Sequence, residues 1–410
     1  MSTVRARLVP RVSVLAARWT QFVAGHRRLS RLLQPIMGAR LETKPARGSG
    51  GGRTDRHRPV HFPQVGRGTQ RLNALPEVET AEFDALVASA RRKREVIVEP
   101  AAARAPWAAE AIAVLGSTGA PMSWTGPPDE VPVALGAELG EAMTGSYGHG
   151  RHGRELRSIR IRRAALALLD ECRGHDASGV TVLLASKRPA DVERAVEFVG
   201  RQRGTTVQLL VGLHGPEWAD GAVERIERLG PPDTTVLRFG VERNLGDLLG
   251  ALTAHARHDL VAKWDDDDWY GDEHLADLVQ AYRYSGADIV GKAAEFVYLE
   301  QSDVTTRRFA FGAESYSWTL AGGALLTSTE WLERVGGWRS VAHGVDRELL
   351  AATRRLGGSA YRTHGFQYVL RRRGGDVHTW AVPDGRFLAA ASTQRPGLDL
   401  AYADVAGSPS

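Results

Sequence analysis

Four short apolar runs recur along the second half of the chain, and each of the first three is followed by a segment with helical periodicity. The runs occupy residues 180–185 (VTVLLA), 207–213 (VQLLVGL), 234–239 and 260–264. Continuous apolar runs rich in β-branched residues predict strands buried on both faces of a parallel sheet. Helices are predicted between them, over residues 191–203, 216–229 and 245–256. This alternation predicts an α/β domain with a doubly wound, mostly parallel sheet.

A weaker strand–helix alternation precedes this domain. Its pattern predicts strands at 95–98 and 120–124, and helices at 80–94, 106–115, 133–143 and 154–172. We therefore expect a small α/β region at 72–175, in which no motif specifies a chemistry. The larger domain is expected to cover residues 176–390, with a flexible tail at 391–410.

The charge of the chain is concentrated at its beginning. The 410 residues carry a formal net charge of +5, but twelve arginines and Lys44 against Glu42 and Asp55 give residues 1–58 a charge of +11. The remainder therefore carries −6, which argues against a nucleic-acid partner for the folded body. Residues 1–71 are predicted to be a basic, partly disordered arm with a Gly-, Arg- and Pro-rich linker at 43–60. The arm is either a solvated segment or a peripheral contact with an anionic membrane surface.

Composition also indicates the compartment. Cys172 is the single cysteine, so an internal disulfide and any multi-cysteine metal site are excluded, and a reducing environment is indicated. No run approaches the ~20 apolar residues of a membrane-spanning helix, and the apolar stretch near Val14 lacks the features of a signal peptide. We expect a cytoplasmic protein whose arm is a candidate for contact with the inner face of the plasma membrane.

An acidic cluster follows the fourth predicted strand. Asp265, Asp266, Asp267 and Asp268 come directly after the apolar run 260–264. In open α/β sheets, ligands bind beyond the carboxyl ends of the strands. Four adjacent carboxylates repel one another unless a cation neutralises them, and oxygen ligands suit Mg²⁺ or Mn²⁺. The alternative is an acidic turn that caps the helix expected near Asp272.

The segment LVAKWDDDDWYGDEHL resembles the D-x-D segment of family 2 glycosyltransferases with the GT-A fold. Further segments are similar to that family in the same order. They are Ala185–Pro189 after the first strand, Asn244–Gly246, the run WTLAGGALL at 318–326, His343–Leu349, Arg371–Arg373, and His378 with Trp380. The resemblance spans about 180–385 and implies a GT-A-like nucleotide-diphospho-sugar transferase domain.

The resemblance implies a role for particular residues. It makes Asp346 the catalytic base of an inverting single displacement, and it makes three aspartates the anchors of a divalent cation, Mg²⁺ or Mn²⁺: Asp265, Asp267 and Asp268. It also implies contacts with the nucleotide-sugar donor and its diphosphate for Ser186, Lys187, Arg188, Asn244, Asp266, Arg373 and His378. Asp346 also opens a predicted amphipathic helix, so a helix-capping role is the alternative.

Two departures from the family pattern leave parts of this interpretation open. Val345 precedes Asp346 where the family usually has a glutamate. The second strand ends in His214-Gly215 without the carboxylate that recognises the nucleoside in many members, so the nucleotide stays open.

The sequence thus predicts a metal-dependent inverting glycosyltransferase of family 2 type. Its expected partners are a nucleotide-sugar donor and a glycan or lipid-linked acceptor, in the synthesis of a cell-surface polysaccharide or glycolipid. Two alternatives remain at this stage: a nucleotidyl- or phosphotransferase that uses a metal-bound diphosphate, and a non-catalytic glycosyltransferase-like scaffold.

Overall fold

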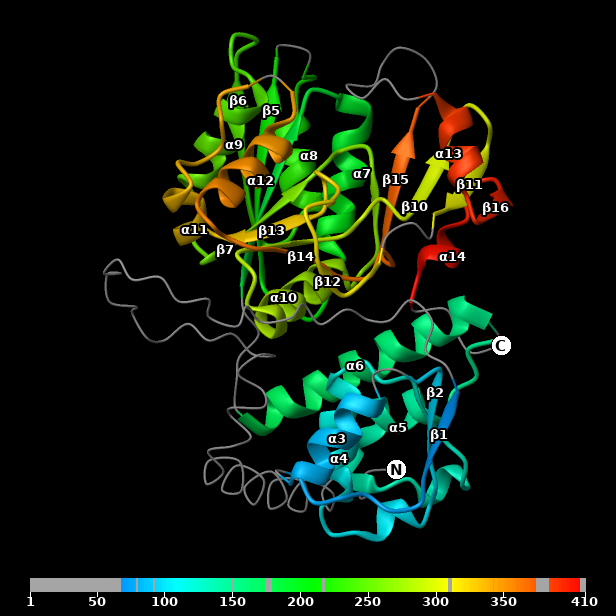
Figure 1. Ribbon diagram of the computed structural model, residues 1–410. Helices are drawn as coiled ribbons and strands as arrows, with labels where there is room; N and C mark the ends of the chain where they lie inside the picture. Colours follow the sequence, from blue (N-terminus) through cyan, green and yellow to red (C-terminus); the bar gives the residue numbers. More distant parts are fainter. Residues whose placement is uncertain are drawn as a thin grey trace, which may run out of the picture. The chain divides into compact units, whose positions relative to one another are not determined.

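The structure is a computed structural model, and it describes residues 68–78, 80–90, 93–148, 150–173, 179–215, 218–308, 312–341, 343–373 and 383–405. The described residues form two compact units, one made of 68–173 and the other of 179–404. Figure 1 shows both units with their helices and strands labelled. Nearly all of the predicted arm, and His378 with Trp380, lie outside the described residues.

The smaller unit contains a three-stranded parallel sheet in the order β1-β2-β3. Its strands are β1 (Thr69–Leu72), β2 (Glu95–Val98) and β3 (Met122–Trp124). Its helices are α3 (Ala81–Ala90), α4 (Ala108–Ser117), α5 (Gly136–Thr144) and α6 (Gly150–Arg173), with short 3₁₀ turns at Ala102–Arg104, Pro128–Glu130 and Val133–Leu135. The predicted alternation is confirmed, and β1 is an additional strand at the end of the segment assigned to the arm.

Helix α4 is the centre of this small unit. All but one of its residues are buried, and Gly116 lets it approach α6 closely, because a Cβ there would lie 3.0 Å from the Cβ of Ala165. A short apolar helix with no charged face can only be stable when neighbours cover it on all sides.

The larger unit is built on an eight-stranded sheet with the order β12-β14-β9-β13-β7-β4-β5-β6. The four predicted strands are confirmed and are parallel neighbours: β4 (Val180–Ser186), β5 (Val207–His214), β6 (Asp233–Phe239) and β7 (Leu260–Trp264). The other half is mixed, since β13 (Leu325–Ser328) runs antiparallel to both β7 and β9 (Ile289–Gly291). The edge is formed by β14 (Ala360–Arg362) and β12 (Ser315–Tyr316).

Both faces of this sheet are covered by helices. Alternate residues of β4 enter two separate cores: Val182 and Leu184 lie in one, and Leu183 in the other. The first core is shared with α7 (Pro189–Gly200), α8 (Ala222–Leu229) and α10 (His274–Ser285). The second is shared with α9 (Leu245–Thr253), α11 (Thr329–Arg334) and α12 (Val345–Arg355). This two-sided burial explains why the strand is apolar at all positions but Thr181 and Ser186.

A second sheet of five strands, in the order β16-β11-β10-β15-β8, was not predicted. Its strands are β8 (Trp269–Tyr270), β10 (Phe296–Leu299), β11 (Val304–Arg307), β15 (Tyr368–Arg372) and β16 (Thr393–Pro396). Two short helices follow β15, α13 (Asp384–Ala390) and α14 (Leu400–Ala403). The segment 391–410, expected to be a flexible tail, therefore contributes β16 and α14, because β16 pairs with β11 through the register Thr305↔Arg395.

Among the described residues, no helix is long and apolar enough to cross a membrane.

Candidate functional site

The acidic cluster lies where the first and fourth predicted strands end side by side. β4 and β7 are parallel neighbours, with Leu184 paired to Trp264. The residues that follow them, Ser186 to Arg188 on one side and Asp265 to Asp268 on the other, therefore meet at the carboxyl edge of the sheet. This confirms the predicted position of the aspartates relative to the strands. It also brings together two of the segments that the sequence analysis assigned to one site.

Both carboxylate oxygens of Asp266 accept hydrogen bonds from the end of β4 and the loop that follows it. Ser186 Oγ donates a hydrogen bond of 2.5 Å to its Oδ2, and Arg188 Nη1 donates one of 2.5 Å to its Oδ1. Burial raises the pKa of Asp266 to about 6, although Arg188 and Ser186 both act to lower it. Asp266 thus anchors the β4 loop to the acidic segment.

Arg188 connects two neighbouring carboxylates. The same nitrogen, Nη1, that contacts Asp266 also lies 2.8 Å from Asp267 Oδ2. The Arg188 side chain is 26% exposed, and it starts from the residue that precedes α7. Lys187, by contrast, is exposed and no described contact brings it to the aspartates.

Asp265 is paired with a buried cation. Lys263 is 6% exposed, and its ammonium donates a short hydrogen bond to Asp265 Oδ1. Burial alone would lower the pKa of Lys263, but the charges of Asp265, Asp346 and Asp268 together raise it above its ordinary value. Lys263 therefore stays charged among two carboxylates of the neighbouring acidic segment and one, Asp346, from a distant part of the chain.

The turn Gly322-Gly323, immediately before β13, is the wall against which Asp346 and Asp265 lie. A Cβ on Gly322 would lie 2.7 Å from Asp346 Oδ2, and a Cβ on Gly323 would lie 2.7 Å from Asp265 Oδ2. Tyr270 fixes this turn to the acidic segment, because its hydroxyl donates to Gly323 O at 2.9 Å and accepts from the Asp265 N–H at 2.9 Å. Only glycines allow both carboxylates to approach the backbone so closely.

The helix predicted to start at Asp346 is α12, which begins one residue earlier, at Val345, and Asp346 is not its N-cap residue. Asp346 lies in the first turn, after Gly344 at the N-cap position, and its side chain is half-buried. Gly344 has a φ of 72°, a conformation that favours glycine. The carboxylate is therefore carried to the site by a helix N-terminus, which also favours a negative charge there.

Asp268 has different surroundings. Its side chain is buried, Tyr368 OH donates to Oδ2 at 2.6 Å, and the Arg371 backbone N–H donates to Oδ1 at 3.0 Å. Burial raises the pKa of Asp268 well above its usual value, and Asp267 and Asp265 add to that effect. The partners are both on β15, so Asp268 ties the acidic segment to the second sheet.

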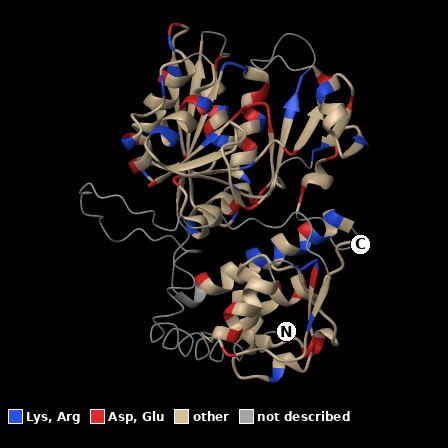
Figure 2. Ribbon diagram, viewed as in Figure 1, with Lys and Arg blue, Asp and Glu red and all other residues tan. Residues whose placement is uncertain are grey.

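The three consecutive arginines at the end of β15 point to different partners. Arg373 pairs with Asp191 of α7, and Arg371 spans from Glu300, at 2.6 Å, toward Asp191, at 3.8 Å. Arg372 instead packs over the ring of Phe387 at 4.7 Å. Figure 2 shows the basic end of β15 in blue. Asp191 was missed by the sequence analysis, and its position in the first turn of α7, three residues after Arg188, was the available signal.

Burial lowers the pKa of the Arg373 guanidinium, but the carboxylates of Asp191, Asp267 and Asp266 together raise it. Arg373 is therefore close enough to the acidic segment to act on it electrostatically. Arg188 contacts Asp266 and Asp267 directly, whereas Arg373 contacts Asp191.

Asn244, which the resemblance assigns to donor contacts, makes hydrogen bonds within the fold. Asn244 caps α9 by accepting from the Asp247 N–H at 3.1 Å, and its amide donates to Ser340 Oγ at 2.8 Å. Trp264 stacks on Tyr270 with a centroid distance of 3.7 Å, and Trp269 packs edge-on against Phe198. These two tryptophans therefore pack against other aromatic side chains of the larger unit.

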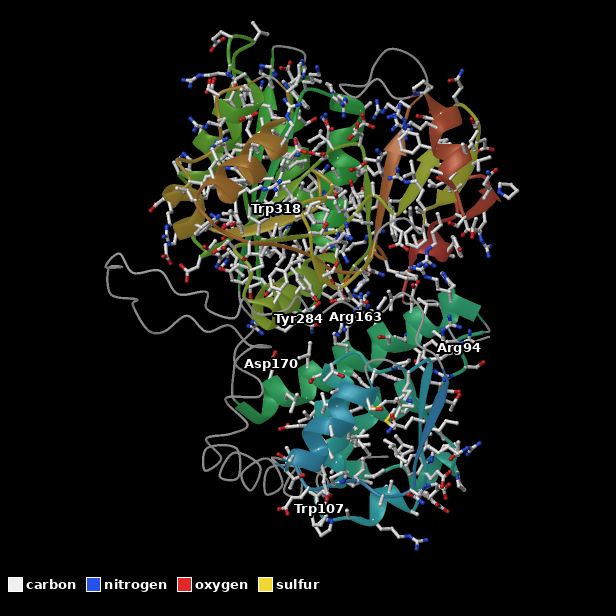
Figure 3. The ribbon with its side chains drawn as sticks, viewed as in Figure 1. Arg94, Trp107, Arg163, Asp170, Tyr284 and Trp318 are labelled. Carbon is white, nitrogen blue, oxygen red and sulfur yellow. The ribbon has the colours of Figure 1, made fainter. Side chains whose placement is uncertain are left out.

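The segment WTLAGGALL at 318–326 divides into a loop and the start of β13. Trp318, labelled in Figure 3, is half-buried against the second core of the large unit, and the Arg354 guanidinium of α12 lies 5.8 Å from its ring centroid. This loop leads directly into the Gly322-Gly323 turn. It therefore forms one side of the space occupied by Asp346.

Within the described residues, no group of three or more His, Cys, Asp or Glu side chains is arranged as a metal site. The carboxylate oxygens nonetheless suit a hard divalent cation as ligands. The side chains of Asp265 and Asp267 are the least buried of the four aspartates, and both already face cationic groups. Asp268 is less suited to this role, because both of its oxygens accept hydrogen bonds from β15.

Comparisons with known proteins add little. No protein-family model matches the chain, and no curated protein matches its sequence. Among solved structures, the chain is similar to the mannosyltransferase PcManGT from Pyrobaculum calidifontis in complex with GDP-Man and Mn²⁺. The identity is 17%, the TM-score is 0.40, and the match covers 52% of this chain and 63% of that one. A similarity of this degree carries no inference about what the present chain binds.

Proposed function

We propose that the larger unit is a divalent-cation-dependent, inverting glycosyltransferase of family 2 type with a GT-A-like arrangement. It would transfer a sugar from a nucleotide-diphospho-sugar to a hydroxyl group of an acceptor. The observation that carries the proposal is the Gly322-Gly323 turn, against which Asp265 and Asp346 lie on adjacent residues. A metal-anchoring carboxylate and a candidate base are thereby brought to one place from positions 81 residues apart.

The two sides of this place suit the two halves of a glycosyl transfer. On the donor side, Asp265 and Asp267 would hold the cation, which supplies Lewis-acid stabilisation of a departing diphosphate. Arg188 contacts Asp266 and Asp267, and Arg373 pairs with Asp191; both would contact phosphate oxygens. On the acceptor side, Asp346 would take the proton of the attacking hydroxyl, which is the role of a general base.

The remaining donor residues follow from this arrangement. Ser186 and Asp266 hold the β4 loop that carries Arg188, so they position the donor site through that residue. Lys187, Asn244 and His378 remain predictions of donor contacts from the resemblance alone. His214 at the end of β5 replaces the family's carboxylate, and we propose no nucleotide on that basis.

Asp268 has the weakest claim among the proposed metal ligands. We retain Asp265 and Asp267 as the cation anchors and assign Asp268 to the attachment of β15, because its two oxygens already have donors. A role in cell-surface glycan or glycolipid synthesis, on the cytoplasmic side of the membrane, remains the biological setting we propose.

The decisive experiment is a panel of nucleotide-sugars incubated with the full chain and Mn²⁺ or Mg²⁺, with EDTA in parallel. We expect slow hydrolysis of at least one donor, with release of the nucleoside diphosphate, and loss of that release in EDTA. Release of a nucleoside monophosphate would favour the nucleotidyl-transfer alternative instead. Absence of any metal-dependent turnover or binding across the panel would favour the scaffold alternative.

A further inference from the structure

Three of the four aspartates contact cationic side chains, and these cations are of two different kinds. Lys263 is 6% exposed, comes from the interior of β7 and contacts Asp265. Arg188 is 26% exposed, comes from a loop and contacts Asp266 and Asp267. The first cation cannot leave without exposing a buried charge, whereas the second has a long flexible side chain that reaches solvent.

The Arg188 nitrogen lies at one of the carboxylate oxygens that the proposed cation would use, Asp267 Oδ2. Nη1 lies 2.5 Å from Asp266 Oδ1 and 2.8 Å from Asp267 Oδ2, so one atom occupies the point between two carboxylate oxygens. Divalent cations bind carboxylate oxygens at about 2.0–2.6 Å. A metal ion that uses Asp267 Oδ2 at that point and the Arg188 guanidinium therefore exclude each other.

The local structure allows Arg188 to leave while its surroundings stay in place. Its backbone N–H donates to Ser186 Oγ at 3.0 Å, and Ser186 Oγ donates in turn to the other oxygen of Asp266. The loop and the carboxylate thus remain attached to each other when the guanidinium moves. A diphosphate bound to the same cation would then offer Arg188 new anionic partners within reach.

We infer that Arg188 is an exchangeable internal counter-ion of this site: it holds Asp267 Oδ2, an oxygen of a proposed cation anchor, when the site is empty of ligand, and it transfers to the diphosphate when cation and nucleotide bind. This inference rests on the cation site of the proposed function. It predicts that the free protein binds the metal weakly, because the metal must first displace a fixed positive charge.

The test measures Mn²⁺ binding in the absence of any nucleotide, from the electron paramagnetic resonance signal of the free ion. The Arg188→Gln variant keeps a hydrogen-bond donor for Asp266 but loses the charge, and we expect it to bind Mn²⁺ about tenfold tighter than the wild type. The Arg188→Lys variant keeps the charge and is expected to bind more like the wild type. Circular dichroism and urea unfolding establish that each variant is folded.

Arg194→Gln is the matched control. Arg194 lies on α7, the helix that follows Arg188, pairs with Asp191 at 3.2 Å, and carries the same charge without contacting the four aspartates. We expect its loss to change Mn²⁺ affinity less than threefold, because a distant exposed charge is screened. An equal gain in Arg194→Gln, no gain in Arg188→Gln, or no Mn²⁺ binding by either protein would overturn the inference.

The outcome is independent of the test of the proposed function. Tighter Mn²⁺ binding by Arg188→Gln with no turnover of any nucleotide-sugar would leave the counter-ion inference standing while the glycosyltransferase proposal failed. Turnover by the wild type with unchanged Mn²⁺ affinity in Arg188→Gln would support the glycosyltransferase proposal and overturn the counter-ion inference.

Discussion

The two ends of the acidic segment have opposite environments although they are three residues apart. Asp265 has a side chain that is 37% exposed, pairs with Lys263 and lies against the Gly322-Gly323 turn. Asp268 is 2% exposed and accepts two hydrogen bonds from β15. The exposed end faces the main sheet and α12, and the buried end is attached to the second sheet.

This difference shows how one residue type serves two purposes in a single turn. A carboxylate with an open oxygen can take a ligand, whereas one whose oxygens are both occupied by buried donors holds two parts of the fold together. The exposed end should therefore control turnover and metal affinity, and the buried end should control stability.

The largest effect is expected at the base that faces the exposed end. Asp346→Asn preserves the size of the side chain but cannot accept a proton, so turnover should fall about 10²–10⁴-fold. The melting temperature should change little. Glu348→Gln, in the same helical turn, is the matched control and should retain most of the activity. Unchanged transfer by Asp346→Asn would remove Asp346 from the mechanism.

At the buried end, Asp268→Ala should cost about 2–4 kcal/mol of unfolding free energy, since it leaves the Tyr368 hydroxyl and the Arg371 N–H without an acceptor. Urea unfolding followed by fluorescence measures this loss. Asp272→Ala is the control, because Asp272 is 37% exposed and its pairs with Arg201 and Arg203 are 3.6 Å long, so its loss should cost less than about 0.5 kcal/mol. Similar stability of the two variants would contradict the anchoring role of Asp268.

The glycine turn offers a finer test of the exposed end. A methyl group on Gly323 would push on Asp265, and one on Gly322 would push on Asp346. Gly323→Ala is therefore expected to weaken Mn²⁺ binding, and Gly322→Ala to slow turnover, each by about tenfold. Gly250→Ala in α9, where a Cβ would meet nothing within 4 Å, should change neither quantity. The same effect of both turn variants on both measurements would show that the two carboxylates are not separately positioned.

The smallest expected effect is on the pH dependence of stability. It comes from His274, which lies beside Tyr368, the hydrogen-bond donor to Asp268. His274 packs edge-on against Tyr270 and lies beside Tyr368, and burial, with the charge of Lys292, lowers the pKa of His274 well below its usual value. The folded state therefore binds this proton less readily than the unfolded state. The contribution of neutral His274 to the unfolding free energy is fully present above the ordinary histidine pKa of 6.5, and it is lost as the pH falls toward the pKa of the folded state.

Urea unfolding of the wild type and of His274→Gln between pH 7.5 and pH 5 tests this sign. The unfolding free energy of the wild type should fall more steeply on acidification than that of the variant. Parallel curves would show that His274 does not contribute to the pH dependence.

Much of the large unit could be predicted from local patterns. The strands 180–185, 207–213, 234–239 and 260–264 are apolar at nearly every position, because helices cover both faces of the sheet, and this burial is visible in sequence. The acidic segment was placed correctly at the carboxyl end of β7 for the same reason.

The second sheet left no comparable trace. Its strands are two to five residues long, and several carry polar or charged residues, such as β16 (Thr393–Pro396). Short half-polar segments have no distinctive period, so β16 was taken for part of a tail. The antiparallel insertion of β13 was hidden for a related reason, since strand direction depends on the partner and not on the pattern.

The sequence by itself therefore determined the parallel strands, their helical cover and the four carboxylates at the end of one strand, because these follow from local composition and periodicity. Only the tertiary structure decided what each carboxylate does. Lys263 pairs with Asp265, Arg188 pairs with Asp266 and Asp267, and β15 donates hydrogen bonds to Asp268. These partners lie at different distances along the chain. Lys263 is two residues from Asp265, but Arg188 and β15 are about 80 to 100 residues from the aspartates they contact, and folding alone brings these partners within a few ångströms.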